Sequence, residues 1–149
     1  MRFGSFNEAI DFAVDREEAA NKFYLKLAAQ MEHAAMKAVF EDFAAEEKLH
    51  KEKLLEIKNG KIELPTVEKV MDLKIGDYLV DVQPNPGIDY QQALVVAMKQ
   101  EKAAFKMYMD IAGMVTDTNL QNTFFMLANE EAKHKLRFEV EYDDLIDEN

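Results

Sequence analysis

The sequence contains no cysteine and little glycine or proline, with 5 Gly and 3 Pro among 149 residues. Without cysteine the chain has no disulfide, no thiolate nucleophile and no sulfur ligand for zinc or an iron–sulfur cluster. The scarcity of glycine and proline indicates long regular elements with few turns, and argues against a β-sandwich of many strands. The lack of cysteine also fits a cytoplasmic protein, which is the location that we predict.

Long apolar runs and positive charge are lacking as well. No stretch approaches the 18 apolar residues of a membrane-spanning helix, and Glu8 and Asp11 interrupt the apolar region that a signal peptide needs. The chain has 18 Lys and Arg against 29 Asp and Glu, which gives a formal net charge of −11. Because no stretch is apolar enough to span a membrane and so acidic a surface repels phosphate backbones, we expect neither a membrane nor nucleic acid as partner.

Apolar residues at helical spacing predict four long amphipathic helices, at about 6–31, 35–58, 89–113 and from just after 116–118 to about 145. Ser5 and Glu8 form a potential capping box before the first helix, and Asn59-Gly60 ends the second. Residues 61–88 are the one long connection, a crossover between helices two and three. This connectivity predicts a single all-α domain over 1–149, a ferritin-like four-helix bundle rather than a simple up-down-up-down one.

The two halves of the chain match each other without a gap when they are shifted by 84 residues, about 5–57 on 89–141. Alanine matches are expected by chance in alanine-rich helices, but matches of glutamate, tyrosine and histidine are harder to dismiss. These informative identities are Glu17/Glu101, Tyr24/Tyr108, Glu46/Glu130, Glu47/Glu131 and His50/His134. The chain therefore contains a repeated helical hairpin.

A Glu-x-x-His pair occurs in the second helix and again in the fourth, and each pair lies on one helix face because three residues turn a helix by about 300°. The first and third helices each offer one matching glutamate. One glutamate from each of two helices and Glu-x-x-His from each of the other two form the ligand set of a dinuclear carboxylate site. The predicted metal ligands are Glu17, Glu47, His50, Glu101, Glu131 and His134.

The positions of these residues relative to the turns support the same site. If the hairpins turn near residues 33 and 117, all six side chains lie at one height of the bundle. Four carboxylates and two imidazoles suit two iron ions, or manganese, better than zinc or magnesium. Without metal the four buried acids would be costly and would have raised pKa values.

Several neighbouring residues compete for these roles. Glu18 has a lysine at the matching position of the repeat, which disfavours it. Glu46 and Glu130 match each other but lie about 100° from the ligand face. His33 lacks a glutamate three residues before it and is predicted to lie in a turn.

Tyr24 and Tyr108 follow Glu17 and Glu101 by seven residues, nearly two turns. Two interpretations stay open: ordinary core tyrosines, or hydrogen-bond donors to a ligand carboxylate on a neighbouring helix. The methionines are predicted to fill the core, among them Met98, Met107, Met109, Met114 and Met126.

Together these residues resemble the rubrerythrin branch of the ferritin-like superfamily. The resemblance covers nearly the whole chain and rests on Glu17 with Phe23-Tyr24, Glu46-Glu47-x-x-His50, Glu101 with Met107-Tyr108, and Glu130-Glu131-x-x-His134. It implies a four-helix bundle with a non-haem di-iron site, reduction of peroxide or dioxygen coupled to iron oxidation, and a homodimer.

Two departures from the family pattern qualify this expectation. Rubrerythrins carry a rubredoxin module with four cysteines, which this chain lacks, so electrons would come from an external donor protein. Many also have an extra glutamate three residues after the helix-three ligand, where this chain has Ala104. The alternatives are iron binding and storage in a larger shell, and an acidic bundle without metal.

Overall fold

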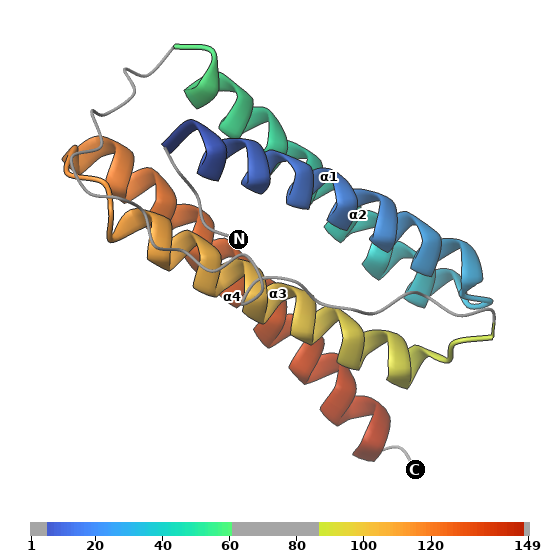
Figure 1. Ribbon diagram of the computed structural model, residues 1–149. Coiled ribbons are helices and arrows are strands. Elements are labelled where there is room, and N and C mark those ends of the chain that lie inside the picture. The colour runs from blue at the N-terminus through green and yellow to red at the C-terminus, as the bar shows by residue number, and fades with distance from the viewer. Residues whose placement is uncertain (1–5, 61–86, 148–149) are drawn as a thin grey trace.

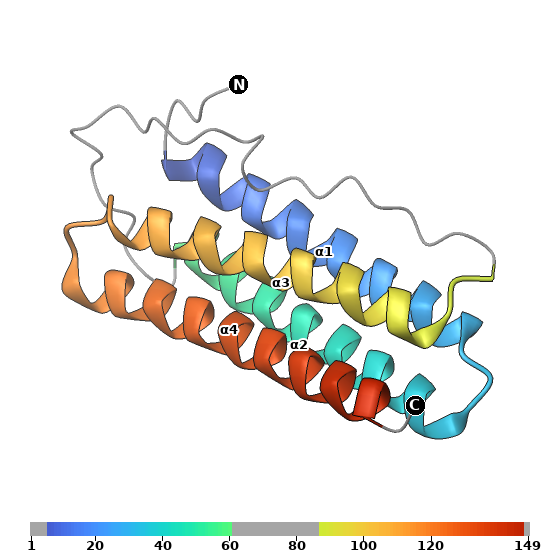
Figure 2. The ribbon, with the colours of Figure 1, turned by 90° about the horizontal axis from the view of Figure 1, so that it is seen from below.

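The computed structural model describes residues 6–60 and 87–147, which fold into α1 (Phe6–Gln30), α2 (Ala34–Lys58), α3 (Tyr90–Ala112) and α4 (Thr118–Asp147). These helices have nearly the predicted bounds, and the described residues contain no strand. Helices α1 and α2 form one antiparallel hairpin, α3 and α4 form another, and the two hairpins lie against each other as a bundle (Figure 1; Figure 2). The all-α fold is confirmed. Ser5 and most of the 61–88 crossover lie outside the described residues.

The helix ends follow local chemistry. Asp89 starts α3 in a capping box with Gln92, whose backbone N–H donates to Asp89 Oδ1 at 2.7 Å. Asp117 starts α4 in the same way by accepting from the backbone N–H of Leu120 at 2.8 Å. Gly60 follows α2 with a φ of +83°, a conformation that glycine adopts without strain. His33 precedes α2 as an exposed turn residue, as predicted.

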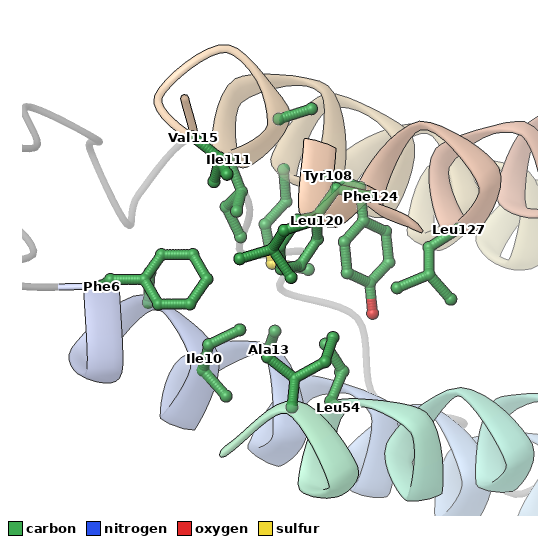
Figure 3. Close-up of a cluster of buried hydrophobic side chains, with 14 of the residues drawn as sticks. Phe6, Ile10, Ala13, Leu54, Tyr108, Ile111, Val115, Leu120, Phe124 and Leu127 are labelled. Carbon is green, nitrogen blue, oxygen red and sulfur yellow. The ribbon is translucent and has the colours of Figure 1, made fainter. Parts of the chain in front are cut away.

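Two apolar clusters fill the bundle and leave a layer between them. The first cluster joins the start of α1 and α4 to the end of α2 and α3, and includes Phe6, Ile10, Leu54, Ile111, Leu120 and Phe124 (Figure 3). The second joins the opposite halves, and includes Tyr24, Leu27, Phe40, Phe43, Leu94 and Phe138. Because the clusters occupy the two ends of the bundle, the residues at mid-length are enclosed on both sides.

The methionines depart from the prediction. Met107 is fully buried, whereas Met109 and Met126 are 39% and 48% exposed, so the expectation of core methionines is wrong for these two. Helical spacing alone does not reveal that these two side chains are exposed to solvent. No helix among the described residues is both long and apolar enough to span a bilayer.

Candidate metal centre

The layer between the two apolar clusters consists of buried ionisable side chains. Four glutamates in it are fully buried, and two histidines are 5% and 7% exposed. They are the six residues that the sequence analysis selected, namely Glu17, Glu47, His50, Glu101, Glu131 and His134. Burying four carboxylates is costly unless cations or hydrogen bonds compensate for the lost water.

The six side chains form two overlapping groups of potential metal ligands. One group comprises Glu17, Glu47, His50 and Glu131, and the other comprises Glu47, Glu101, Glu131 and His134. In each group one donor atom per residue lies within 4.8 Å of all the others. Glu47 and Glu131 belong to both groups, which is the position expected of carboxylates that bridge two ions.

The donor atoms that face this space lack ordinary hydrogen-bond partners. In the described part of the chain, no hydrogen bond is made by Nδ1 of His50, by Nδ1 of His134 or by either carboxylate oxygen of Glu131. The same holds for one oxygen each of Glu17, Glu47 and Glu101. His50 Nδ1 lies 2.7 Å from Glu131 Oε1 but without hydrogen-bond geometry. Unpartnered oxygens and imidazole nitrogens that converge on a shared space fit divalent metal ions.

The outer edge of each imidazole contacts a carboxylate from the opposite hairpin. His50 Nε2 bonds to Glu130, and His134 Nε2 lies against Glu46. These contacts leave Nδ1 of each ring directed at the cluster. Histidines that bind metal often have a carboxylate on the other ring nitrogen, which fixes the orientation of the ring. Glu46 and Glu130 are not among the predicted ligands, because helical geometry places them about 100° from the face that carries Glu47 and Glu131. The match of Glu46 with Glu130 across the repeat was the feature of the sequence that could have indicated this role.

Each of the two tyrosines donates a hydrogen bond to one of the unshared glutamates, which belong to only one ligand group. Tyr24 donates to Glu101 Oε1 and Tyr108 donates to Glu17 Oε1, both at 2.5 Å. Each bond joins α1 to α3, so it crosses from one hairpin to the other. Of the two interpretations left open, this geometry is that of donors to a carboxylate on a neighbouring helix.

Arg16 is the main feature of this layer that sequence reasoning missed. Its side chain is 8% exposed, and Nη1 donates to Glu17 Oε1 at 3.0 Å. The repeat gave no signal for it, because the matching position holds Gln100. A single arginine in a charged helix is also usually a surface residue.

Electrostatics divide the four acids into two pairs. Burial and the charges of Glu101 and Glu17 raise the pKa of Glu47 to about 8. Burial and the same neighbours together with Glu47 raise the pKa of Glu131 well above its usual range. The two glutamates shared by both groups therefore hold protons most readily in the metal-free protein.

The other pair departs from the prediction that all four acids have raised pKa values. Burial opposes ionisation of Glu17, but His50 and Arg16 outweigh it and lower the pKa of Glu17 to about 2. Burial is likewise outweighed at Glu101, whose pKa is lowered by Glu131, His134 and Arg16. Sequence reasoning counted the carboxylates but not the cations among them.

A groove of about 550 Å³ between α2 and α4 reaches this layer from outside. Its walls combine apolar residues such as Phe43 and Met126 with the two glutamates that contact the imidazoles. His50 and His134 form its inner end, where their rings lie parallel with centroids 5.9 Å apart. The groove brings solvent to the histidine side of the cluster.

Comparisons with known proteins give a family match and two structures of similar fold. A family model described as Rubrerythrin matches residues 8–142. A hypothetical protein from Pyrococcus furiosus has a similar structure, with a TM-score of 0.75, 24% identity, and coverage of 96% of this chain and 91% of that one. A Thermotoga maritima protein, provisionally described as ferritin-like and diiron-carboxylate, gives a TM-score of 0.73, 15% identity, and 96% and 95% coverage. A search of curated proteins found no match.

Proposed function

Because this chain belongs to the rubrerythrin family, we propose that it is a non-haem di-iron oxidoreductase that reduces hydrogen peroxide or dioxygen with electrons from an external donor. The observation that carries the proposal is the pair of buried donor groups that share Glu47 and Glu131. Two neighbouring ions with shared carboxylates suit a two-electron reaction at one place. The family match supports the assignment of iron as the metal, and manganese is the alternative.

In this proposal the chain's residues have distinct tasks. Glu47 and Glu131 would hold both ions, while Glu17 with His50 and Glu101 with His134 would each complete one position. Tyr24 and Tyr108 fix the orientation of the unshared glutamates through their hydrogen bonds. The apolar clusters close the layer to water toward the two ends of the bundle, while the groove reaches its histidine side.

The bound iron pair would supply two electrons, so that one hydrogen peroxide and two protons yield two waters, and the external donor would return the electrons. Access for a small oxidant runs along the groove between α2 and α4. Glu46 and Glu130 lie on this groove, half exposed, and touch the imidazole Nε2 atoms. They are therefore placed to keep the rings oriented while the groove stays open to water.

The test is rapid mixing of anaerobic, iron-loaded protein with peroxide or with dioxygen, followed by the absorbance of the oxidised iron. We expect about two irons per chain and complete oxidation by at least one of the two oxidants. A protein that purifies without metal and binds none when Fe²⁺ is added contradicts the proposal. Retention of many more than two irons per chain, in a particle far larger on a sizing column than the homodimer that the family resemblance implies, would favour storage instead.

If the missing carboxylate at position 104 limits peroxide turnover, Ala104→Glu is expected to raise the rate of peroxide reduction relative to dioxygen reduction by about tenfold, which corresponds to about 1.4 kcal/mol in the barrier. Ala104 is fully buried on α3, three residues after Glu101, so a carboxylate there lies on the ligand face. An extra anion near the iron pair favours the oxidised state. The measurement is single-turnover oxidation of the reduced protein by each oxidant.

Two matched variants control this prediction. Ala104→Gln adds the same bulk without charge, and Ala20→Glu places the carboxylate at the matching position of the repeat on α1. If Ala104→Gln changes the ratio of the two rates as much as Ala104→Glu, the added volume is responsible and the charge argument is wrong.

A further inference from the structure

Arg16 is a buried cation at one side of the carboxylate cluster. Nη1 donates to Glu17 Oε1 at 3.0 Å and also contacts Glu47 Oε2 at 3.5 Å. Nη2 donates to the backbone carbonyl oxygen of Gln100 on α3 at 2.9 Å. The guanidinium is thus held between α1 and α3, against one unshared and one shared glutamate.

This cation breaks the symmetry that the rest of the layer follows. Glutamates, histidines and tyrosines all have a counterpart 84 residues away, but the counterpart of Arg16 is the uncharged Gln100. As a result Glu17 Oε1 accepts from both Arg16 and Tyr108. Glu101 Oε1 accepts from Tyr24.

We infer that Arg16 makes the two metal positions unequal, so that the Glu101–His134 position fills first and the Glu17–His50 position binds its ion more weakly. This inference rests on the proposed function. The group of ligands around His50 contains both carboxylates that Arg16 contacts, whereas the group around His134 contains only Glu47 of the two. A guanidinium stays protonated, so an ion beside it meets a like charge and a competitor for the same oxygens.

The same contacts give Arg16 a role in the metal-free protein. Four carboxylates are buried together there, and Arg16 supplies a fixed positive charge among them. Removing one partner of a buried ion pair leaves the other uncompensated, which is strongly destabilising. Arg16 therefore stabilises the fold before metal arrives, at the expense of affinity for the second ion.

The test compares Arg16→Gln, which copies the residue of the other half, with Lys26→Gln. Lys26 is exposed on the same helix, so its replacement changes the net charge equally without touching the cluster. Metal-free proteins are titrated with Co²⁺ under nitrogen, and the two binding steps are measured by visible absorbance and calorimetry. Two ions repel each other in any dinuclear site, so a weak second step alone does not identify the effect of Arg16. The decisive quantity is the difference in second-step affinity between Arg16→Gln and Lys26→Gln.

For the wild type and Lys26→Gln we expect a tight first step and a weak second step. In Arg16→Gln the second step tightens by about tenfold or more, because a unit charge a few Å from the ion is removed. Glu17→Gln is expected to lose the weak step and Glu101→Gln the tight one. Without metal, Arg16→Gln unfolds at a lower temperature than Lys26→Gln, while Arg16→Lys, which keeps the charge, retains the weak second step.

Two outcomes separate this inference from the proposed function. Equal steps in the wild type, or a second step in Arg16→Gln no tighter than in Lys26→Gln, overturn the role of Arg16 and leave a dinuclear site in place. A wild-type protein that binds no Co²⁺ overturns the proposed function and the inference with it.

Discussion

Replacing Glu47 or Glu131 with alanine is expected to reduce bound metal from about two ions per chain to nearly none. Each of these glutamates belongs to both groups of donor atoms, so one substitution removes a ligand from both positions. Each position then keeps three protein ligands, and loss of a charged ligand lowers affinity by orders of magnitude. Metal content is measured by elemental analysis after anaerobic loading with Fe²⁺ and removal of the excess.

The unshared ligands provide a graded comparison. Glu101→Ala and His134→Ala affect one group and are expected to leave about one ion per chain. His33→Ala is the matched control, because this histidine is exposed in the turn before α2 and belongs to neither group. Metal content that is the same in Glu47→Ala, His33→Ala and the wild type would refute the assignment of the buried layer as a metal site.

Much of this layer was predictable because helical geometry is local. The spacing of Glu47 and His50 determines that both lie on one face, whatever the helix packs against. The repeat then located the matching residues of the second hairpin, and equal distances from the two turns placed them at one height. That the structure brings these six side chains together follows from these rules, while their binding of metal stays a prediction.

The features that were missed depend on how one hairpin meets the other. Glu130 contacts His50 across the bundle, and helical spacing says nothing about the angle between the hairpins. Arg16 is one position from the predicted ligand Glu17, and it packs against α3, where the Gln100 backbone carbonyl accepts a hydrogen bond from it. The repeat matches Arg16 with the uncharged Gln100, so the similarity of the two halves gives no indication of its role.

The pattern of raised and lowered pKa values followed from the same contacts. Counting four acids predicted repulsion throughout, but Arg16 and the two histidines lie closest to particular acids. Burial opposes ionisation of Glu17, but the neighbouring His50 and the direct contact with Arg16 outweigh it, so its ionised form is favoured. Glu47 also lies 3.5 Å from Arg16, but burial and the charges of Glu101 and Glu17 disfavour its ionised form.

Metal removal is expected to destabilise the protein most at pH 8 and least near pH 5. In the metal-free fold the pKa of Glu47 is raised to about 8, that of His50 to about 9 and that of His134 to about 10. Burial and neighbouring acids raise the pKa of Glu47. Burial opposes protonation of the two histidines, but the adjacent glutamates outweigh this effect and raise the histidine pKa values.

The sign of the pH dependence follows from proton binding. Between about pH 4.5 and 8 the folded state holds a proton on Glu47 that the unfolded chain has released, and above about pH 6.5 the same holds for the histidines. Folding stability therefore falls as pH rises from 5 to 9, by about 1.4 kcal/mol per pH unit for each extra proton. Below pH 4.5 the lowered pKa values of Glu17 and Glu101 reverse the trend, so stability is greatest near pH 5.

Metal binding acts in the opposite direction. Ions compete with protons for the same carboxylates and imidazoles, so they stabilise the fold more as pH rises. At a free metal concentration of about a thousand times Kd, two sites add about 8 kcal/mol, at about 4 kcal/mol each. We expect thermal unfolding with Mn²⁺ at pH 8 to occur tens of degrees above that of the metal-free protein, with a much smaller difference at pH 5.

Glu47→Gln isolates the contribution of the site. The whole chain has a net charge of −11, so general repulsion also weakens as pH falls, and this variant keeps that background almost unchanged. The metal-free variant lacks the carboxyl with the raised pKa, so its unfolding temperature should decline less between pH 5 and 8 than that of the wild type. A metal-free wild type whose unfolding temperature instead drops steadily from pH 8 to 5 is incompatible with protons shared among buried glutamates, because such protons stabilise the fold in that range.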